Sequence, residues 1–291
     1  MTILNIEHRT VYRYTRPVHF GEHRVMCRPR DSHDLKLLDT SLTVSPPATS
    51  RWIHDVFGNS IALLNFADEA AELSVVSTIR AEHFPAPPTA IAIDSYATQL
   101  PFSYSKDEVG DLARTRDRHY DDPQHRVDEW AREVLNATPK RATLDALVNM
   151  AKRIKEEFRY ARREDMGTQT PDKTLELGTG SCRDFALLMM EAARSLGLAA
   201  RSVSGYLYDP RLIGAKEGVV GTGATHAWVQ VYLPGAGWVE YDPTNALIGG
   251  SNLIRVAVAR DASQAAPLSG SFTGTIKDFI GMDVSVTVTA Q

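Results

Sequence analysis

Residues 180–207 read GSCRDFALLMMEAARSLGLAARSVSGYL, and residues 225–245 read THAWVQVYLPGAGWVEYDPTN. In the first stretch, apolar side chains recur every three or four residues after Ser181, which predicts a helix with one buried face. Gly197 follows the last apolar position and is typical of a helix end. The repeat therefore indicates a helix that begins near Ser181 and stops at Gly197.

After that helix the apolar repeat changes to every second residue, which indicates strands. The expected strands cover residues 200–207, 225–233 and 238–242. The turn Pro234–Gly237 makes the last two antiparallel neighbours. If Leu233 pairs with Trp238, positions 226 and 242 fall within about three residues of direct opposition, and their contact depends on the register. Helices followed by antiparallel strands favour an α+β fold.

Three side chains in these stretches could act together. Cys182 lies where the helix begins, and the unpaired backbone N–H groups there favour the reactive thiolate. His226 could accept the thiol proton, and Asp242, in an Asp-Pro turn, could hold the imidazole in one tautomer. Each alone has an ordinary structural explanation: a core cysteine, a hydrogen-bonded strand histidine and a turn aspartate. Their order along the chain makes a catalytic triad the stronger interpretation.

Both stretches closely resemble the core of the bacterial transglutaminase-like superfamily. The resemblance implies a papain-like fold in which Cys182 is the nucleophile, His226 the base and Asp242 the orienting carboxylate. It also implies chemistry that needs no cofactor and no metal. Members of the family include cross-linking enzymes, amidases and peptidases, so the resemblance does not identify the acceptor.

The residue that would bind the oxyanion departs from the best-known members of the family. Animal transglutaminases use a tryptophan that lies closer to the nucleophile than Trp130, the nearest one upstream here. Tyr160 is a candidate substitute, and the backbone N–H of Cys182 is another. The missing tryptophan counts against transglutaminase activity more than it counts against the triad.

The N-terminal part of the chain has a different character. Residues 1–88 alternate apolar and polar side chains between turn signals, which predicts an antiparallel β-sandwich that ends in the proline-rich linker Phe84–Pro88. Through IEHRTVYRY, CRPR and DVFGNS this part resembles the β-domain that precedes the core in bacterial members. Residues 89–291 are expected to form the catalytic core, with helices from near Pro123 and Thr143 and a C-terminal strand extension.

Composition and short motifs argue against several other classes of function. A net charge of -4 gives no basic surface for nucleic acid or for an anionic membrane. No run reaches the ~18 apolar residues of a membrane span, and we expect a cytoplasmic protein of bacterial type. His19, His23 and Cys27 would align as metal ligands only on a helix, whereas their surroundings predict strands.

The glycine-rich loop 214–223 is a candidate mobile cover over the site.

Together these features predict cysteine-dependent acyl transfer on a carboxamide or peptide bond through a thioester intermediate. The expected partner is a protein or peptide substrate. The first alternative is a cysteine peptidase or amidase that hydrolyses a peptide. The second alternative, of another class, is a non-catalytic protein-binding module on a transglutaminase-like fold. The oligomeric state stays open.

Overall fold

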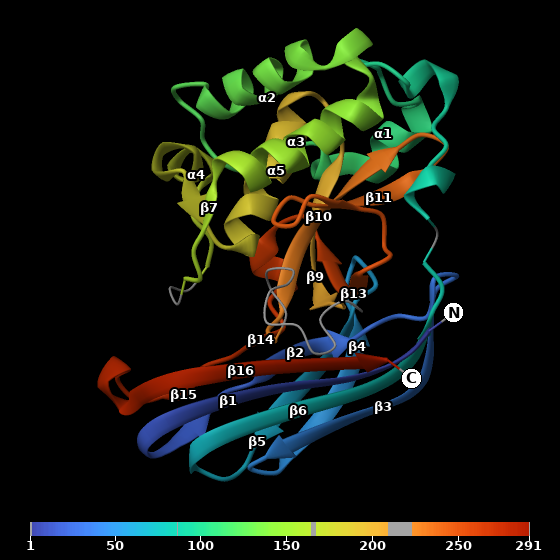
Figure 1. Ribbon diagram of the computed structural model, residues 1–291. Helices are drawn as coiled ribbons and strands as arrows, with labels where there is room; N and C mark the ends of the chain where they lie inside the picture. Colours follow the sequence, from blue (N-terminus) through green and yellow to red (C-terminus); the bar gives the residue numbers. More distant parts are fainter. Residues whose placement is uncertain (1, 86, 164–166, 209–222, 291) are drawn as a thin grey trace.

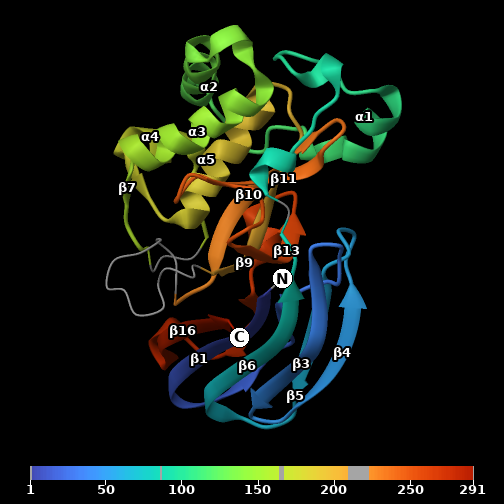
Figure 2. The same cartoon turned by 45° about the vertical axis from the view of Figure 1, so that its right-hand side comes forward.

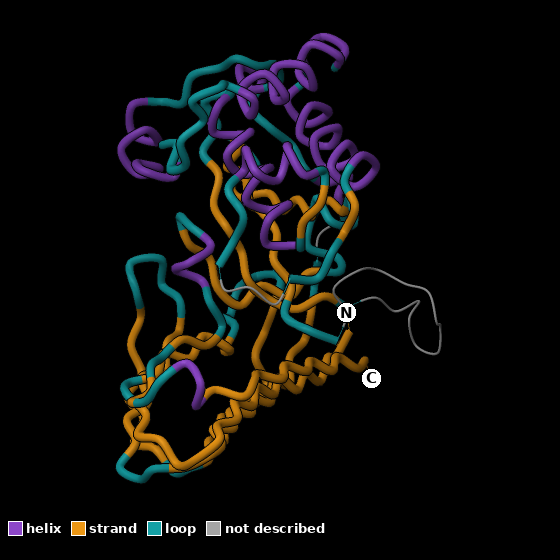
Figure 3. The backbone as a smooth tube through the Cα atoms, turned by 90° about the vertical axis from the view of Figure 1, so that its left-hand side faces the viewer, coloured by secondary structure: helices purple, strands orange, loops and turns teal. Residues whose placement is uncertain are grey.

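The protein consists of a β-sandwich and a helix-covered sheet, stacked end to end (Figure 1). The computed structural model describes residues 2–85, 87–163, 167–208 and 223–290. Figure 3 shows that the helices gather at one end of the molecule and the long strands at the other. Within the described residues, no helix is both long enough and apolar enough to span a bilayer.

Strands from both ends of the chain build the sandwich. The N-terminal strands are β1 Thr2–Phe20, β2 His23–Arg28, β3 Leu35–Ser45, β4 Ala48–His54, β5 Ser60–Phe66 and β6 Ala70–His83. The C-terminal strands are β14 Leu268–Ser269, β15 Phe272–Thr273 and β16 Phe279–Ala290. One sheet has the order β15-β1-β6-β3, with β16 also on β1, and the other has the order β14-β2-β5-β4. The predicted antiparallel sandwich is therefore confirmed.

The last strand, β16, lies in the sandwich and not in the part that carries the helices. The sequence assigns it to segment 89–291 as an extension. In the structure it runs antiparallel along β1, from Leu4 opposite Ala290 to Tyr14 opposite Phe279. The division of the chain at residue 88 stays a prediction, but the sandwich draws on both ends of the chain.

The second part is a five-stranded sheet with the order β12-β11-β10-β9-β13 and helices packed against it. Its strands are β9 Ala200–Leu207, β10 His226–Leu233, β11 Gly237–Asp242, β12 Leu247–Ile248 and β13 Leu253–Ala259. Its helices are α1 Lys106–Leu112, α2 Arg126–Ala137, α3 Thr143–Glu157, α4 Pro171–Leu177 and α5 Cys182–Ser195. A short parallel pair, β7 Arg159–Tyr160 and β8 Thr179–Gly180, leads into α5.

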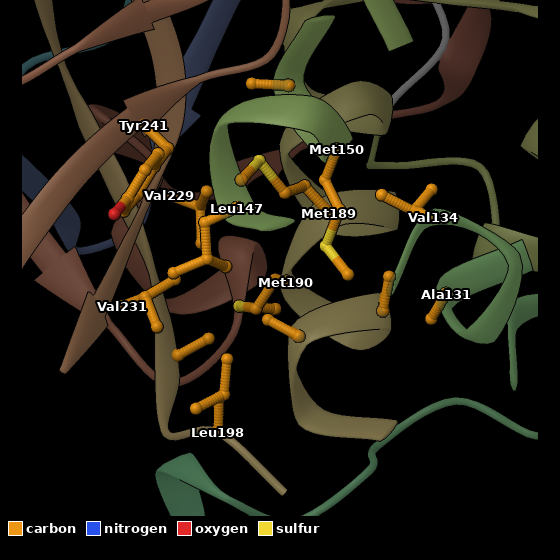
Figure 4. Close-up of a cluster of buried hydrophobic side chains, with 14 of the residues drawn as sticks. Ala131, Val134, Leu147, Met150, Met189, Met190, Leu198, Val229, Val231 and Tyr241 are labelled. Atoms are coloured by element: carbon orange, nitrogen blue, oxygen red, sulfur yellow. The ribbon is translucent and has the colours of Figure 1, made fainter. Parts of the chain in front are cut away.

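Helix α5 lies at the centre of this part, between β10 and the helices α2 and α3. Figure 4 shows its side chain Met189 in one apolar cluster with Leu147 of α3 and with Val229 and Val231 of β10. All four side chains are fully buried. Burial of this kind stabilises a domain in proportion to the apolar area removed from water, and it holds α5 at a fixed position relative to β10.

Helix α2 begins later than the sequence predicts. The expected start is near Pro123, whereas the helix starts at Arg126. The Asp122 carboxylate accepts the backbone N–H groups of Val127 and Asp128 at 3.1 and 3.2 Å. First-turn N–H groups have no partner within a helix, so the side chain that satisfies them sets the start, and the proline stays outside.

Polar contacts join the sandwich to the five-stranded sheet of the second part. The Asn59 side chain accepts the Val258 backbone N–H at 2.9 Å and donates to the Val258 carbonyl at 2.7 Å. Arg255 of β13 lies 3.4 Å from the Asp34 carboxylate. Because both contacts are made by β13, the sandwich lies against one edge of the sheet that carries the site.

Candidate active site

Cys182 is the first residue of α5, and its side chain is buried. The Asp184 carboxylate fixes this helix end, because it accepts both the backbone N–H and the hydroxyl of Ser181 at 2.8 Å. It also accepts Nη1 of Arg163 at 2.8 Å and the backbone N–H of Gln169 at 2.7 Å. A buried carboxylate with this many donors is fully satisfied, and it holds the start of the helix and the thiol in place.

The strand register brings His226 and Asp242 to one face of the sheet. Leu233 pairs with Gly237, one residue away from the pairing with Trp238 that served as the example while the register was open. In the observed register, the two side chains are diagonal neighbours on the same face. A shift of one residue would have put them on opposite faces, since side chains alternate along a strand.

The His226 imidazole and the Asp242 carboxylate are hydrogen-bonded, with 2.9 Å between Nε2 and Oδ2. Both side chains are buried. Asp242 also accepts the Thr244 backbone N–H at 2.9 Å and Nδ2 of Asn245 at 2.8 Å. Asn245 is not among the residues predicted from the sequence. Its only signal there is the run Asp-Pro-Thr-Asn, which is typical of a turn closed by the aspartate side chain.

The two reactive groups shift each other's pKa in opposite directions. Burial acts to raise the pKa of the Cys182 thiol, but His226 and the Ala227 backbone N–H outweigh it and hold that pKa below its usual value. Burial acts to lower the pKa of His226, but Asp242 and the thiol raise it. Nδ1 of His226 has no hydrogen bond of standard geometry within the described residues. Catalytic hydrogen bonds are often long before substrate binds, so Nδ1 is still the atom that can exchange a proton with sulfur.

Comparison with known proteins adds to this geometry. The chain matches the Bacterial transglutaminase-like N-terminal region over residues 4–82 and the Transglutaminase-like superfamily over residues 128–243. It is 30% identical to the uncharacterized protein Rv2569c of Mycobacterium tuberculosis, over 97% of this chain and 91% of that one. The chain belongs to the transglutaminase-like superfamily.

A solved structure shares the fold of this transglutaminase-like protein. It is a Cytophaga hutchinsonii protein provisionally described as a cysteine protease, with a TM-score of 0.73 and 18% identity over 99% of this chain and 90% of that one. Identity at this level shows the fold alone. Family and fold together indicate a cysteine-based catalytic fold. The catalytic roles of Cys182, His226 and Asp242 stay a prediction.

Trp228 supports the histidine of the transglutaminase-like site. Its ring stacks on His226, with centroids 6.0 Å apart and 28° between the planes. On the neighbouring strand β9, Gly205 lies opposite His226. A Cβ atom at Gly205 would come within 2.6 Å of the Trp228 ring and 2.2 Å of the Ile254 carbonyl oxygen. A side chain at position 205 would therefore displace the ring on which the imidazole rests.

Tyr160 lies beside the start of α5, where the candidate nucleophile Cys182 is found. Strands β7 and β8 pair so that Tyr160 is opposite Gly180, just before Cys182. Burial first, and the charge of Cys182 second, raise the pKa of the Tyr160 phenol to about 12. The hydroxyl is therefore a proton donor at neutral pH. Its role as oxyanion donor stays a prediction.

The remaining sequence candidates lie elsewhere. His19 is exposed at the end of β1, whereas His23 and Cys27 are buried in β2. Across the described ranges, no three or more His, Cys, Asp or Glu side chains are grouped so that they could hold a metal ion. Burial raises the pKa of the Cys27 thiol to about 12, the opposite of the shift at Cys182. Of the predicted cover 214–223, all but the last residue lies outside the described residues.

Proposed function

We propose that this protein is a cysteine-dependent acyl transferase that acts on a carboxamide or peptide bond through a thioester. Cys182 is the nucleophile, His226 carries protons, and Asp242 orients the imidazole. The main support is one arrangement: a thiol at a helix start, beside an imidazole whose Nε2 is bonded to a buried carboxylate at 2.9 Å. The substrate is a protein or peptide.

The reaction has two halves. The Cys182 thiolate attacks the carbonyl carbon, a C–S bond forms, and the carbonyl oxygen becomes an oxyanion. The oxyanion collapses, the C–N bond breaks, and Nδ1 of His226 gives its proton to the departing amine, which leaves a thioester and a neutral imidazole. An incoming amine or water then attacks the thioester and gives its proton to Nδ1. The C–S bond breaks and the thiolate is restored.

Iodoacetamide alkylation with peptide mapping tests this proposal. At pH 6 to 7, Cys182 should be labelled faster than Cys27, because the thiolate is the form that reacts. His226→Ala should slow labelling of Cys182 by about tenfold or more, since only the Ala227 backbone N–H would then oppose the rise in the thiol pKa that burial causes. Cys27 serves as the internal reference in the same protein. Equal labelling of both cysteines, unchanged by the substitution, would mean that no triad assembles.

The fate of the thioester separates the two enzyme hypotheses. Cys182-dependent incorporation of a fluorescent amine into casein would identify an amine acceptor. New amino termini or released ammonia would identify water as the acceptor, and therefore an amidase or peptidase. We expect hydrolysis to dominate in vitro because water is always present. Cys182→Ala should abolish either product.

A non-catalytic protein-binding role is the remaining alternative. Ordinary reactivity of Cys182 in a folded protein would favour it, because a binding module has no need of a thiolate. The net charge of -4 supports the further proposal that neither nucleic acid nor an anionic membrane is a partner. The cytoplasmic location also remains a proposal.

A further inference from the structure

Strand β16 is an edge strand whose outer side lies near the site. It pairs with β1, and among the described residues no strand pairs with its other side. Its ladder with β1 runs from Ala290 to Gly281 without a shift of register. Figures 1 and 2 both show β16 running below the ends of β9 and β10, and it contacts β9. Among the described residues, the backbone groups on this side of β16 therefore have no strand partner, close to the strand that begins with His226.

One hydrogen bond shows how this edge can be used. The Val286 backbone N–H donates to the Gly223 carbonyl at 3.0 Å, and Gly223 lies three residues before His226. In an antiparallel ladder the backbone groups of alternate residues point away from the partner strand, so Val284 and Met282 also direct their N–H and C=O groups outward. Within the described residues, no other backbone group bonds to this side of β16.

Exposed apolar side chains lie at the far end of β16 and just before it. Ile280 and Met282 of the strand are 63% and 51% exposed, and Ile276, three residues before the strand begins, is 81% exposed. The nearest charged side chain on the strand, Asp283, is already in an ion pair with Arg13. Apolar side chains beside unpaired backbone groups are typical of an edge that another extended chain covers.

We propose that an extended segment of the peptide substrate adds to the outer edge of β16 as a further strand and so delivers the reacting carbonyl to Cys182. The inference rests on the proposed function. The occupant is a peptide because the edge offers backbone donors and acceptors at strand spacing, which only another backbone matches along its length. About three residues at ~3.4 Å each would span Met282 to Val284, next to the bond that Val286 already makes with Gly223. The exposed apolar side chains favour aliphatic residues at the end of the segment far from the site.

Two thiol reagents on the full chain separate edge binding from thiol reactivity. Small reagents such as iodoacetamide and chloroacetamide need only the thiol. A short valine- and threonine-rich peptide that carries a chloroacetyl group at one end or the other can also bind the edge. Because both carry the same reactive group, we expect this peptide to label Cys182 faster than chloroacetamide does. Methylation of one alternate set of its backbone amides should slow labelling by about three- to tenfold, and methylation of the other set should not. Equal rates for all the peptides would overturn the proposal.

A matched pair of variants tests the strand itself. Val284→Pro removes one outward N–H and spares the ladder to β1, and Val284→Ala loses the same side chain but keeps the N–H. The proline variant should react with the peptide about three- to tenfold more slowly than the alanine variant, and both should react equally with iodoacetamide. Equal peptide rates for the two variants would show that the edge is not used.

Amide exchange keeps the test independent of catalysis and of variant folding. In the wild-type protein, the chloroacetyl-free peptide should slow exchange at the amides of Val284 and Met282. Protection of these amides before peptide is added, or no change after it, would overturn the proposal. If iodoacetamide does not prefer Cys182 over Cys27, the proposed function has failed, and amide exchange still decides whether the edge binds peptide.

Discussion

The two ring nitrogens of His226 have different surroundings. Nε2 is held by Asp242, whereas Nδ1 has no hydrogen-bond partner among the described residues. In the proposed function, Nδ1 carries the proton between sulfur and the departing amine without rotation of the ring. Asp242 is itself fixed by Thr244 and Asn245. The orientation of the base therefore depends on the turn that directly follows β11.

Tyr160 can be tested as an oxyanion donor apart from the thiol. Tyr160→Phe should slow the burst of nitrophenol from p-nitrophenyl acetate by about tenfold to a hundredfold, because one donor to the developing oxyanion is lost. Alkylation by iodoacetamide forms no oxyanion and should not change. Tyr241→Phe is a matched control, since its hydroxyl is buried without a hydrogen-bond partner among the described residues. A normal burst in Tyr160→Phe would leave the Cys182 backbone N–H as the donor.

At the scale of single elements, the sequence predicts helices better than strand register. Helix α5 follows from local signals, because Ser181 and Gly197 mark its ends within one stretch of chain. The register of β10 and β11 depends on which residues the turn uses, and Gly237 proves to be paired with Leu233 and not part of the turn. A difference of one residue decides whether the base and its carboxylate share a face, and alternation alone does not contain that information.

Gly205 on β9 gives a test of how neighbouring elements position the base. Gly205→Ala should lower the free energy of unfolding by about 1–3 kcal/mol, since its Cβ would overlap the Trp228 ring and the Ile254 carbonyl. Urea denaturation measures this loss, and iodoacetamide labelling of Cys182 should slow as the imidazole shifts. Gly110→Ala is the control, because nothing lies within 4 Å of that position and alanine favours the helix. An unchanged labelling rate in Gly205→Ala would show that Trp228 does not position the imidazole.

At the scale of the whole molecule, the pairing of β16 with β1 could not be predicted. The alternation near the C-terminus predicts a strand, and the apolar pattern indicates which side chains are buried. Neither identifies a neighbour that lies at the other end of the chain. The fold class and the three candidate site residues come from local patterns and from resemblance, whereas the closure of the sandwich depends on tertiary packing.

The junction between the two parts contains a buried histidine. Nδ1 of His8 lies 3.0 Å from the Tyr206 hydroxyl and 3.3 Å from the Cys27 sulfur, and Nε2 lies 3.2 Å from the Thr10 hydroxyl. Tyr206 belongs to β9, and the other three residues belong to the sandwich. Burial lowers the pKa of His8 to about 4, so the imidazole is neutral when the parts are joined.

This histidine should make the protein sensitive to acid. An unfolded histidine has a pKa near ~6.5, so between pH 6.5 and about 4 the unfolded chain binds a proton that folded His8 does not. Stability therefore falls as the pH is lowered through that window, and His8 accounts for about 2–3 kcal/mol of the loss. Urea denaturation at pH 7 and at pH 4.5 measures the free energy of unfolding. Between these two pH values, His8→Gln should lose less of this free energy than the wild type does.

The sign of this effect separates His8 from His226. The pKa of His226 is raised, so its contribution is complete below pH ~6.5 and is lost only as the pH rises through the folded pKa. The titration of His226 therefore cannot account for a loss of stability in acid. Burial also lowers the pKa values of His23 and His83, so His8→Gln should remove only part of the loss of stability between pH 7 and 4.5. If His8→Gln and the wild-type protein lose the same free energy of unfolding between pH 7 and 4.5, protonation of His8 does not drive the acid loss.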